Sequence, residues 1–179
     1  RAATIDGADD DRRVRMSLSS EEPVERSFGL EVLEHTAEAI DLSRLGSGHA
    51  PLLLDHDMTK QIGVIENVSL DNAERKLRAV VRFGKGPLAR EILEDVKDGV
   101  RSNVSIGYVI RNMEQKNDRS GTVSVNSWVP YEASIVSVAA DTSVGINRNA
   151  NFVETTKVKE ENKMTEVNTD EIRLEATEA

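Results

Sequence analysis

The chain has 179 residues, of which 38% are hydrophobic and 31% are charged, and its formal net charge is -9 at pH 7. This length suits one domain with a hydrophobic core, and the negative charge argues against a nucleic-acid partner, because a surface that binds the phosphate backbone has to be basic. The absence of cysteine excludes disulfides, thiolate zinc sites and cysteine proteases, and since no apolar run reaches membrane-spanning length we expect a soluble protein without a membrane partner.

The two ends of the chain differ in composition from its middle. Residues 1–22 contain acidic and basic runs with little periodicity, so we expect a flexible leader that holds at most a short strand at 13–18. Residues 149–179 are rich in Glu, Lys, Thr and Asn, and they predict an acidic flexible tail or a linker to a downstream scaffold or capsid region. The single domain is expected over residues 23–148.

The middle of the chain predicts mainly strands. Strands are expected over residues 24–32, 51–54, 61–70, 76–83, 104–110, 122–128 and 132–138. In the fourth of these, Leu77, Ala79, Val81 and Phe83 share one face because side chains alternate along a strand. The pattern therefore favours an α+β fold that is mostly β.

One amphipathic helix interrupts the strands. Pro87 suits the first helical position, and Gly99 suits the left-handed residue just beyond a helix end. Between them the apolar side chains that fall on one helical stripe are Leu88, Ile92, Leu93 and Val96.

The chain contains three histidines, His35, His49 and His56. His56 directly follows a short apolar strand, whereas His35 lies in a glutamate-rich polar stretch, so His56 is the best candidate for a general base. If Asp55 and Asp57 are extended, their side chains point away from the imidazole, and a third catalytic group has to come from elsewhere in the chain. This Asp-His-Asp triplet also resembles a metal site, but it lacks a second histidine at ligand spacing, so we expect no metal or other cofactor.

Ser105 is the candidate nucleophile. It lies on the strand face opposite the apolar side chains of its own strand, and its neighbour on that face is Gly107, which leaves room for a substrate backbone. A serine hydroxyl needs a base to remove its proton, and His56 is the best-placed base. Ser102 is a weaker candidate, and an ordinary surface serine is the alternative interpretation.

Four segments in this order resemble the maturation proteases of tailed-phage proheads, which are distant relatives of the herpesvirus assemblins. The segments are LLLDHDMTKQIGVIENV, KLRAVVRFGKGPLAREILEDVKDG, RSNVSIGYVI and PYEASIVSVAADTSVGI. The resemblance covers roughly residues 28–147. Ala139-Ala140 replaces a Pro-Ala pair that the family often has, so the loop after the last strand is expected to differ in shape.

The resemblance implies an assemblin-like antiparallel β-barrel with a few surrounding helices. It implies that Glu132, in a Glu-x-Ser-hydrophobic-Val segment, is the third catalytic residue beside His56 and Ser105, with Asp141 as the alternative. Backbone amides around Ala140 would then form the oxyanion hole.

The implied function is that of a serine endopeptidase inside the assembling prohead, in the host cytoplasm. Its partners would be the major capsid protein, whose scaffold segment it would cleave, and further copies of itself, through self-cleavage and a homo-oligomer. A non-catalytic scaffolding or capsid-assembly module is the rival hypothesis, and a fusion of the protease to a scaffold or capsid region is another.

Overall fold

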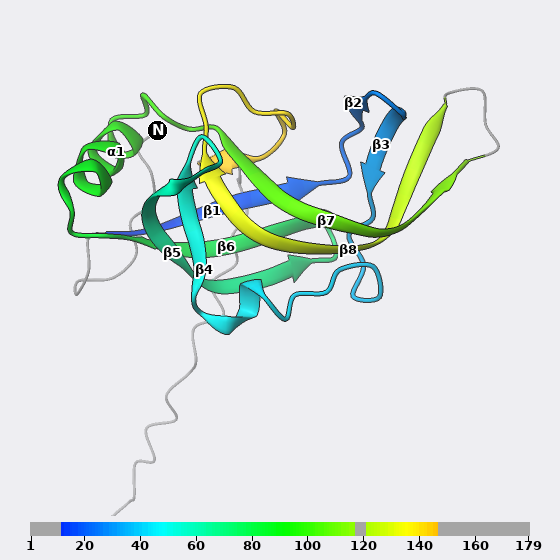
Figure 1. Cartoon of the computed structure of the whole chain (residues 1–179), viewed down its shortest axis with the longest axis horizontal. Coiled ribbons are helices and arrows are strands. Elements are labelled where there is room, and N and C mark those ends of the chain that lie inside the picture. The colour runs from blue at the N-terminus through cyan, green and yellow to red at the C-terminus, as the bar shows by residue number, and fades with distance from the viewer. Residues whose placement is uncertain (1–11, 117–120, 147–179) are drawn as a thin grey trace, which may run out of the picture.

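The computed structural model describes residues 12–116 and 121–146. Within these ranges the chain forms a nine-stranded sheet, one α-helix and one short 3-10 helix. The elements are β1 (Arg13–Ser20), β2 (Val24–Arg26), β3 (Gly29–Leu33), η1 (Leu45–Ser47), β4 (Ala50–Leu54), β5 (Asp57–Asp71), β6 (Lys76–Phe83), α1 (Pro87–Lys97), β7 (Val104–Gln115), β8 (Thr122–Ile135) and β9 (Gly145–Ile146). Figure 1 shows β7 and β8 as a long curved hairpin, with α1 at one end of the molecule. No helix in the described ranges is long and apolar enough to cross a membrane.

Strand β8 organises the sheet. It pairs antiparallel with β7 along one edge, and on its other edge it pairs parallel with β3 near its start and with β4 near its end. Strands β5, β6, β1 and β9 follow β4 in that order, each antiparallel to its neighbour. The parallel pairing with β4 brings the end of that strand beside the end of β8.

The mostly β class predicted from the sequence is confirmed, but a closed barrel is not. The sheet is curved and its ladder stays open, although the amide of Ile146 in β9 donates a 3.0 Å hydrogen bond to the carbonyl of Ser102, just before β7. The two parallel pairings of β8 also depart from an all-antiparallel sheet. A parallel pair needs a long crossover between its strands, and local sequence patterns do not show which distant strands a crossover joins.

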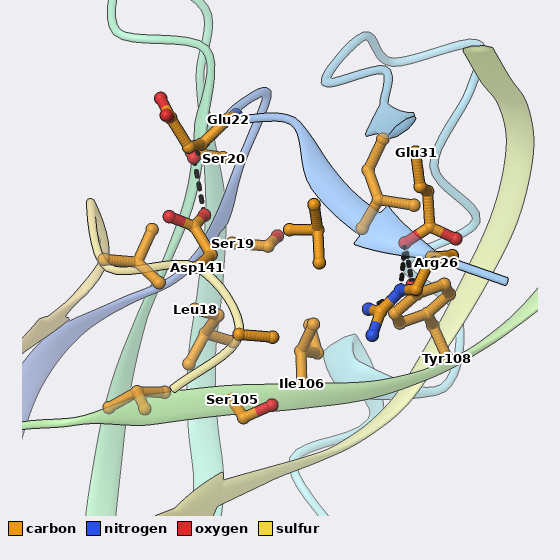
Figure 2. A pocket seen from close by; sticks show the side chains of 15 residues that line it. Leu18, Ser19, Ser20, Glu22, Arg26, Glu31, Ser105, Ile106, Tyr108 and Asp141 are labelled. Carbon is orange, nitrogen blue, oxygen red and sulfur yellow. Dashed lines mark hydrogen bonds and ion pairs between the residues drawn. The ribbon is translucent and has the colours of Figure 1, made fainter. Parts of the chain in front are cut away.

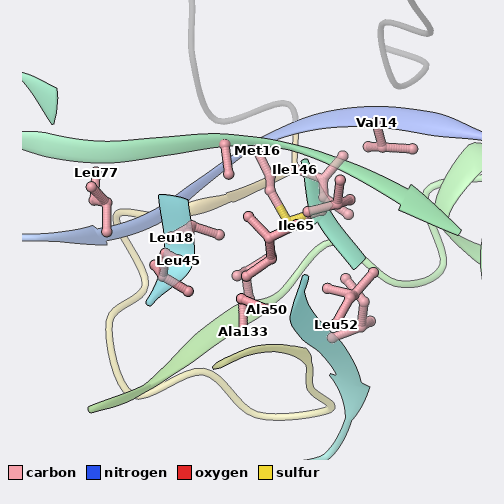
Figure 3. Close-up of a cluster of buried hydrophobic side chains, with 14 of the residues drawn as sticks. Val14, Met16, Leu18, Leu45, Ala50, Leu52, Ile65, Leu77, Ala133 and Ile146 are labelled. Carbon is pink, nitrogen blue, oxygen red and sulfur yellow. The ribbon is translucent and has the colours of Figure 1, made fainter. Parts of the chain in front are cut away.

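The core lies inside the curved sheet. The four residues predicted on one face of β6 are at most 2% exposed, which confirms that prediction. Figure 3 shows the side chains of several strands meeting in this core, among them Met16, Leu18, Leu52, Ile65 and Leu77.

The helix begins and ends as the sequence predicted. Pro87 is its first residue, and Gly99 beyond its last turn has φ of 75°. Its buried stripe differs by one residue, because Ala89 is buried and Leu88 is 37% exposed.

Within the leader expected over residues 1–22, the short strand allowed at 13–18 is present as β1, which extends to Ser20. It belongs to the core, because it pairs with both β6 and β9, and its residues Val14, Met16 and Leu18 are each 1% exposed. Their alternation is typical of a half-buried strand. Residues 1–11 and the tail expected over 149–179 lie outside the described residues.

Two predicted strand boundaries are also wrong. The strand expected over 24–32 is a hairpin of β2 and β3, with Gly29 at φ of 129° after the turn. The two strands expected over 122–138 are the single strand β8, which contains Pro130. Proline is tolerated there because the register shifts beside it, between Gly107 and Tyr108 of β7.

Candidate active site

A two-residue turn presents His56 to the rest of the molecule. Strand β4 ends at Leu54 and β5 begins at Asp57, so Asp55 and His56 alone connect them, with φ of 50° and 58°. Two left-handed residues are the geometry of a type I′ hairpin turn, which usually contains Asn or Gly. A histidine in this conformation is unfavourable, and surrounding contacts have to stabilise it.

Glu132 of β8 contacts the His56 ring directly. The Nδ1 atom of His56 lies 2.7 Å from Oε1 of Glu132, whose side chain is 2% exposed while that of His56 is 44% exposed. Because a carboxylate only accepts hydrogen bonds, the proton of the neutral ring lies on Nδ1. The Nε2 atom then carries the lone pair, which is the form a general base requires.

Ser134 fixes both the carboxylate and the turn. Its hydroxyl donates to Oε2 of Glu132 at 2.8 Å and accepts the backbone N–H of His56 at 3.1 Å. The side chain of Ser134 is fully buried. One hydroxyl therefore connects the histidine turn to the group that orients the histidine ring.

Ser105 of β7 lies directly opposite Ser134 in the β7–β8 ladder. Residues opposite one another in an antiparallel pair have Cβ atoms about 5 Å apart and share a face of the sheet. In the described ranges the Ser105 hydroxyl makes no hydrogen bond, and its side chain is half-buried. The structure thus places Ser105, Glu132 and His56 around a single residue, Ser134.

Gly107 has a different role from the one the sequence suggested. It lies opposite Glu132 in the ladder, and a Cβ atom at this position would lie 2.2 Å from Oε1 of Glu132. The space beside Ser105 is therefore filled by the carboxylate that contacts His56, and glycine is required so that this carboxylate can lie across β7.

The two aspartates beside His56 form hydrogen bonds with other groups and not with its ring, as expected. The segment is a tight turn, however, and not the extended strand from which that expectation was drawn. Asp55 accepts the backbone N–H of Ser137 at 3.0 Å. Hydrogen bonds from Thr59 and then Lys60 lower the pKa of Asp57 to about 2. The Nδ1 contact of His56 comes instead from Glu132, on a distant strand.

His35 is a core residue, contrary to its assignment to a polar stretch. It is fully buried, its ring contacts Trp128 with centroids 5.4 Å apart, and its Nε2 and Nδ1 atoms lie 2.8 Å from the Ser19 hydroxyl and the Leu33 carbonyl. Burial lowers the pKa of His35. His49 is exposed beside η1.

Asp141 lies in a different set of contacts from Glu132. Its Oδ2 atom accepts a 2.6 Å hydrogen bond from Ser20, and its Oδ1 atom accepts from Ser143. Figure 2 shows Asp141 and Ser105 on the lining of one pocket, with the Asp141 carboxylate directed to Ser20. Ala140 lines the same pocket.

The other end of this pocket carries a partly buried polar cluster that the sequence did not indicate. Tyr108 of β7 donates to Oε1 of Glu31, and Arg26 donates to the same oxygen at 3.1 Å and to the tyrosine oxygen at 3.2 Å (Figure 2). Burial, followed by the contact with Glu31, raises the pKa of Tyr108 to about 12.

Ser134 is the site residue that sequence reasoning missed. The signal was present, because Glu132 and Ser134 are two apart on one strand and therefore share a face. That face is the one to which Ser105 and Gly107 belong, but the β7–β8 register needed to recognise this is set over the whole hairpin.

Comparisons with known proteins identify the family of the chain. The family model described as caudovirus prohead serine protease matches residues 24–160. The major capsid protein of Halomonas phage phiHAP-1 is 52% identical over 138 residues, which is 74% of this chain and 23% of that protein. The chain thus spans less than a quarter of the length of that relative. No solved structure matches the chain.

The family match includes every segment that supplies His56, Ser105, Glu132 and Ser134, and it extends over more than half of the chain. The chain therefore belongs to the caudovirus prohead serine protease family.

Proposed function

We propose that this domain is a serine endopeptidase that cleaves scaffold segments of capsid proteins, and itself, during maturation of a phage prohead. The observation that carries the proposal is the 2.7 Å contact between His56 and the buried Glu132. Glu132 lies on β8, two residues before Ser134, which is the cross-strand partner of Ser105. A buried carboxylate on Nδ1 holds the imidazole in the tautomer that removes a proton from serine.

In the proposed mechanism the Nε2 atom of His56 takes the proton of the Ser105 hydroxyl as the oxygen attacks the peptide carbonyl. The tetrahedral intermediate collapses when His56 returns this proton to the leaving amine, which gives an acyl-enzyme. Water, deprotonated by His56, then attacks the ester, and the carboxylic acid leaves as Ser105 regains its proton. Glu132 orients His56 and stabilises its protonated form, and amides around Ala140 are the proposed donors to the oxyanion.

The substrate and the site of action are proposed from the family and from the relative. A major capsid protein that contains a segment 52% identical to this chain supports a protease domain fused to a capsid region. Cleavage would then take place inside the assembling prohead. The same relative supports a second candidate function, in which the domain is a capsid-assembly module and its serine is incidental.

A fluorophosphonate probe, which reacts with activated serines, separates the two candidates. Labelling of the chain that disappears in Ser105→Ala supports the protease. Absence of labelling, both in the isolated chain and inside proheads, would favour the assembly module.

Self-cleavage is tested by mass spectrometry. We expect incubation to release fragments from the ends of the active chain that lie outside residues 12–146, because these ends are rich in charged residues and poor in periodic apolar residues. The Ser105→Ala chain is the control, and equal trimming of both chains would indicate a contaminating protease.

A further inference from the structure

A second hollow lies further along the β7–β8 hairpin, on the face that carries Ser105. Alternation along β7 places Ser105, Gly107 and Val109 on this face, and Val109 is directly opposite Val129 of β8. The hollow has a volume of about 410 Å³ and is lined by Arg44, Val109, Arg111, Val129 and Tyr131.

Its floor is apolar and open. Val109 is 56% exposed, in the middle of a long paired strand. Tyr131 is the extra residue of a bulge, because Gly107 pairs with Glu132 while the next residue of β7 pairs with Pro130. A bulge redirects the side chain at its position, and here it brings the tyrosine ring to the two valines. An aliphatic side chain that binds on this floor would bury apolar surface against Val109, Val129 and Tyr131 and would displace the water over them.

The rim of the hollow is positively charged. Arg111 pairs with Asp41 at 2.9 Å, but both side chains are partly exposed, so the pair contributes little and is readily rearranged. Arg44 forms no ion pair with any described residue. Two arginines beside an apolar floor, in a chain of net charge -9, favour an acidic side chain next to an aliphatic one.

The distance to the nucleophile fixes which part of a peptide reaches this hollow. Val109 follows Ser105 by four residues, which in a strand corresponds to about 13 Å. A peptide that lies extended along the hairpin has nearly the same rise per residue. A residue about four positions from the scissile bond would therefore lie over Val109.

We infer that this hollow is a substrate subsite, which binds an aliphatic residue about four positions from the scissile bond together with an acidic residue two positions from the aliphatic one, since residues two apart in an extended peptide share a face. The inference rests on the proposed function for the position of the scissile bond, whereas binding of the peptide depends only on the hollow.

The test is affinity selection from a random decapeptide mixture by the full Ser105→Ala chain, with bound peptides read by mass spectrometry. We expect enrichment of peptides with an aliphatic and an acidic residue two positions apart. Val109→Thr and Arg44→Gln should each lower this enrichment roughly threefold to tenfold, because each removes one of the two attractions. The matched control is Val100→Thr, which makes the same change at an exposed valine after α1 that does not line the hollow.

Selection without this preference, or a preference unchanged in both variants, would overturn the subsite. Labelling of wild-type Ser105 by fluorophosphonate tests the proposed function separately. If Ser105 is labelled but the peptides are not enriched, the subsite is wrong and the protease proposal stands. If the peptides are enriched but Ser105 is not labelled, the hollow binds peptides on a domain that is not a protease. With the active chain, cuts in the enriched peptides should lie three to five residues from the aliphatic-acidic pair.

Discussion

Gly107→Ala is the sharpest test of the candidate site, because the three atoms nearest to the added methyl group all belong to Glu132, the proposed third catalytic residue. The new Cβ would lie 2.2 Å from Oε1 of Glu132 and 2.9 Å from its Cγ and Cδ atoms. An ordinary contact is at least 3.4 Å, so the carboxylate has to move by about 1 Å. The His56 ring lies 2.7 Å from the same oxygen, which leaves no room to move toward the imidazole.

The displacement weakens the hydrogen bonds that Glu132 makes with His56 and Ser134. A hydrogen bond to a charged group contributes about 1.5–3 kcal/mol, so we expect the free energy of unfolding to fall by about 2 kcal/mol. A misplacement of 1 Å in a catalytic constellation lowers the rate roughly 100-fold. The rate of fluorophosphonate labelling at Ser105 should fall by this factor while the chain remains folded.

Two further variants make this test specific. Gly46→Ala adds a methyl group where no atom lies within 4 Å. Its labelling rate and its free energy of unfolding should therefore equal those of the wild type. Glu132→Asp, combined with Gly107→Ala, shortens the acidic side chain by one methylene and should restore part of the labelling rate. A folded Gly107→Ala chain that labels at the wild-type rate would refute the role given to Glu132.

The remaining predictions concern the reacting groups and one buried histidine. Ser105→Ala should abolish peptide cleavage measured by mass spectrometry, whereas Ser102→Ala should retain most of it. The reverse result would make Ser102, just before β7, the nucleophile. His56→Ala should lower cleavage as much as Ser105→Ala, since triad members act as a unit, and Glu132→Gln should lower it roughly 100-fold to 10,000-fold; full activity in either variant would remove that residue from the mechanism. The pKa of His35 is lowered in the folded chain. As the pH falls below 6.5, His35 therefore becomes protonated in the unfolded chain before it does in the folded chain. The free energy of unfolding, measured in urea, should then decrease by up to about 1.4 kcal/mol per pH unit. His35→Gln should flatten this dependence, and an equally steep dependence would assign it to other groups.

Local sequence patterns predicted much of the secondary structure, because the alternation of apolar residues and the residues at helix ends depend on nearby positions in the chain. The span of β6 and the ends of α1 were predicted from alternation, a proline at the first turn and a glycine after the last. A short strand at 13–18 was also allowed by the sequence, but its place in the core was not predicted, because that place depends on pairing with the distant strand β6. The break expected between residues 128 and 132 is absent, because the bulge beside Pro130 lets β8 continue through the proline.

The candidate site was predictable to the extent that each residue carries its own chemical signal. His56 after an apolar strand and Ser105 beside a glycine are such signals, and Glu132 came from the family resemblance. The contact between Glu132 and His56 was not derivable from spacing, because it depends on the parallel pairing of β4 with β8. The role of Gly107 was misread for the same reason, since its cross-strand partner depends on the register of β7.

The histidine turn explains why Ser134 matters as much as the residues that react. A residue other than glycine in the left-handed conformation costs about 1–2 kcal/mol, and this turn contains two of them in succession. The Ser134 hydroxyl offsets part of this cost by accepting the backbone N–H of His56, and the same hydroxyl donates to Glu132. Backbone and side chain of His56 are therefore held through one buried group on β8. Since Ser105 is the cross-strand partner of that group, the pairing of β7 with β8 sets the position of the proposed nucleophile, Ser105, relative to the proposed base, His56.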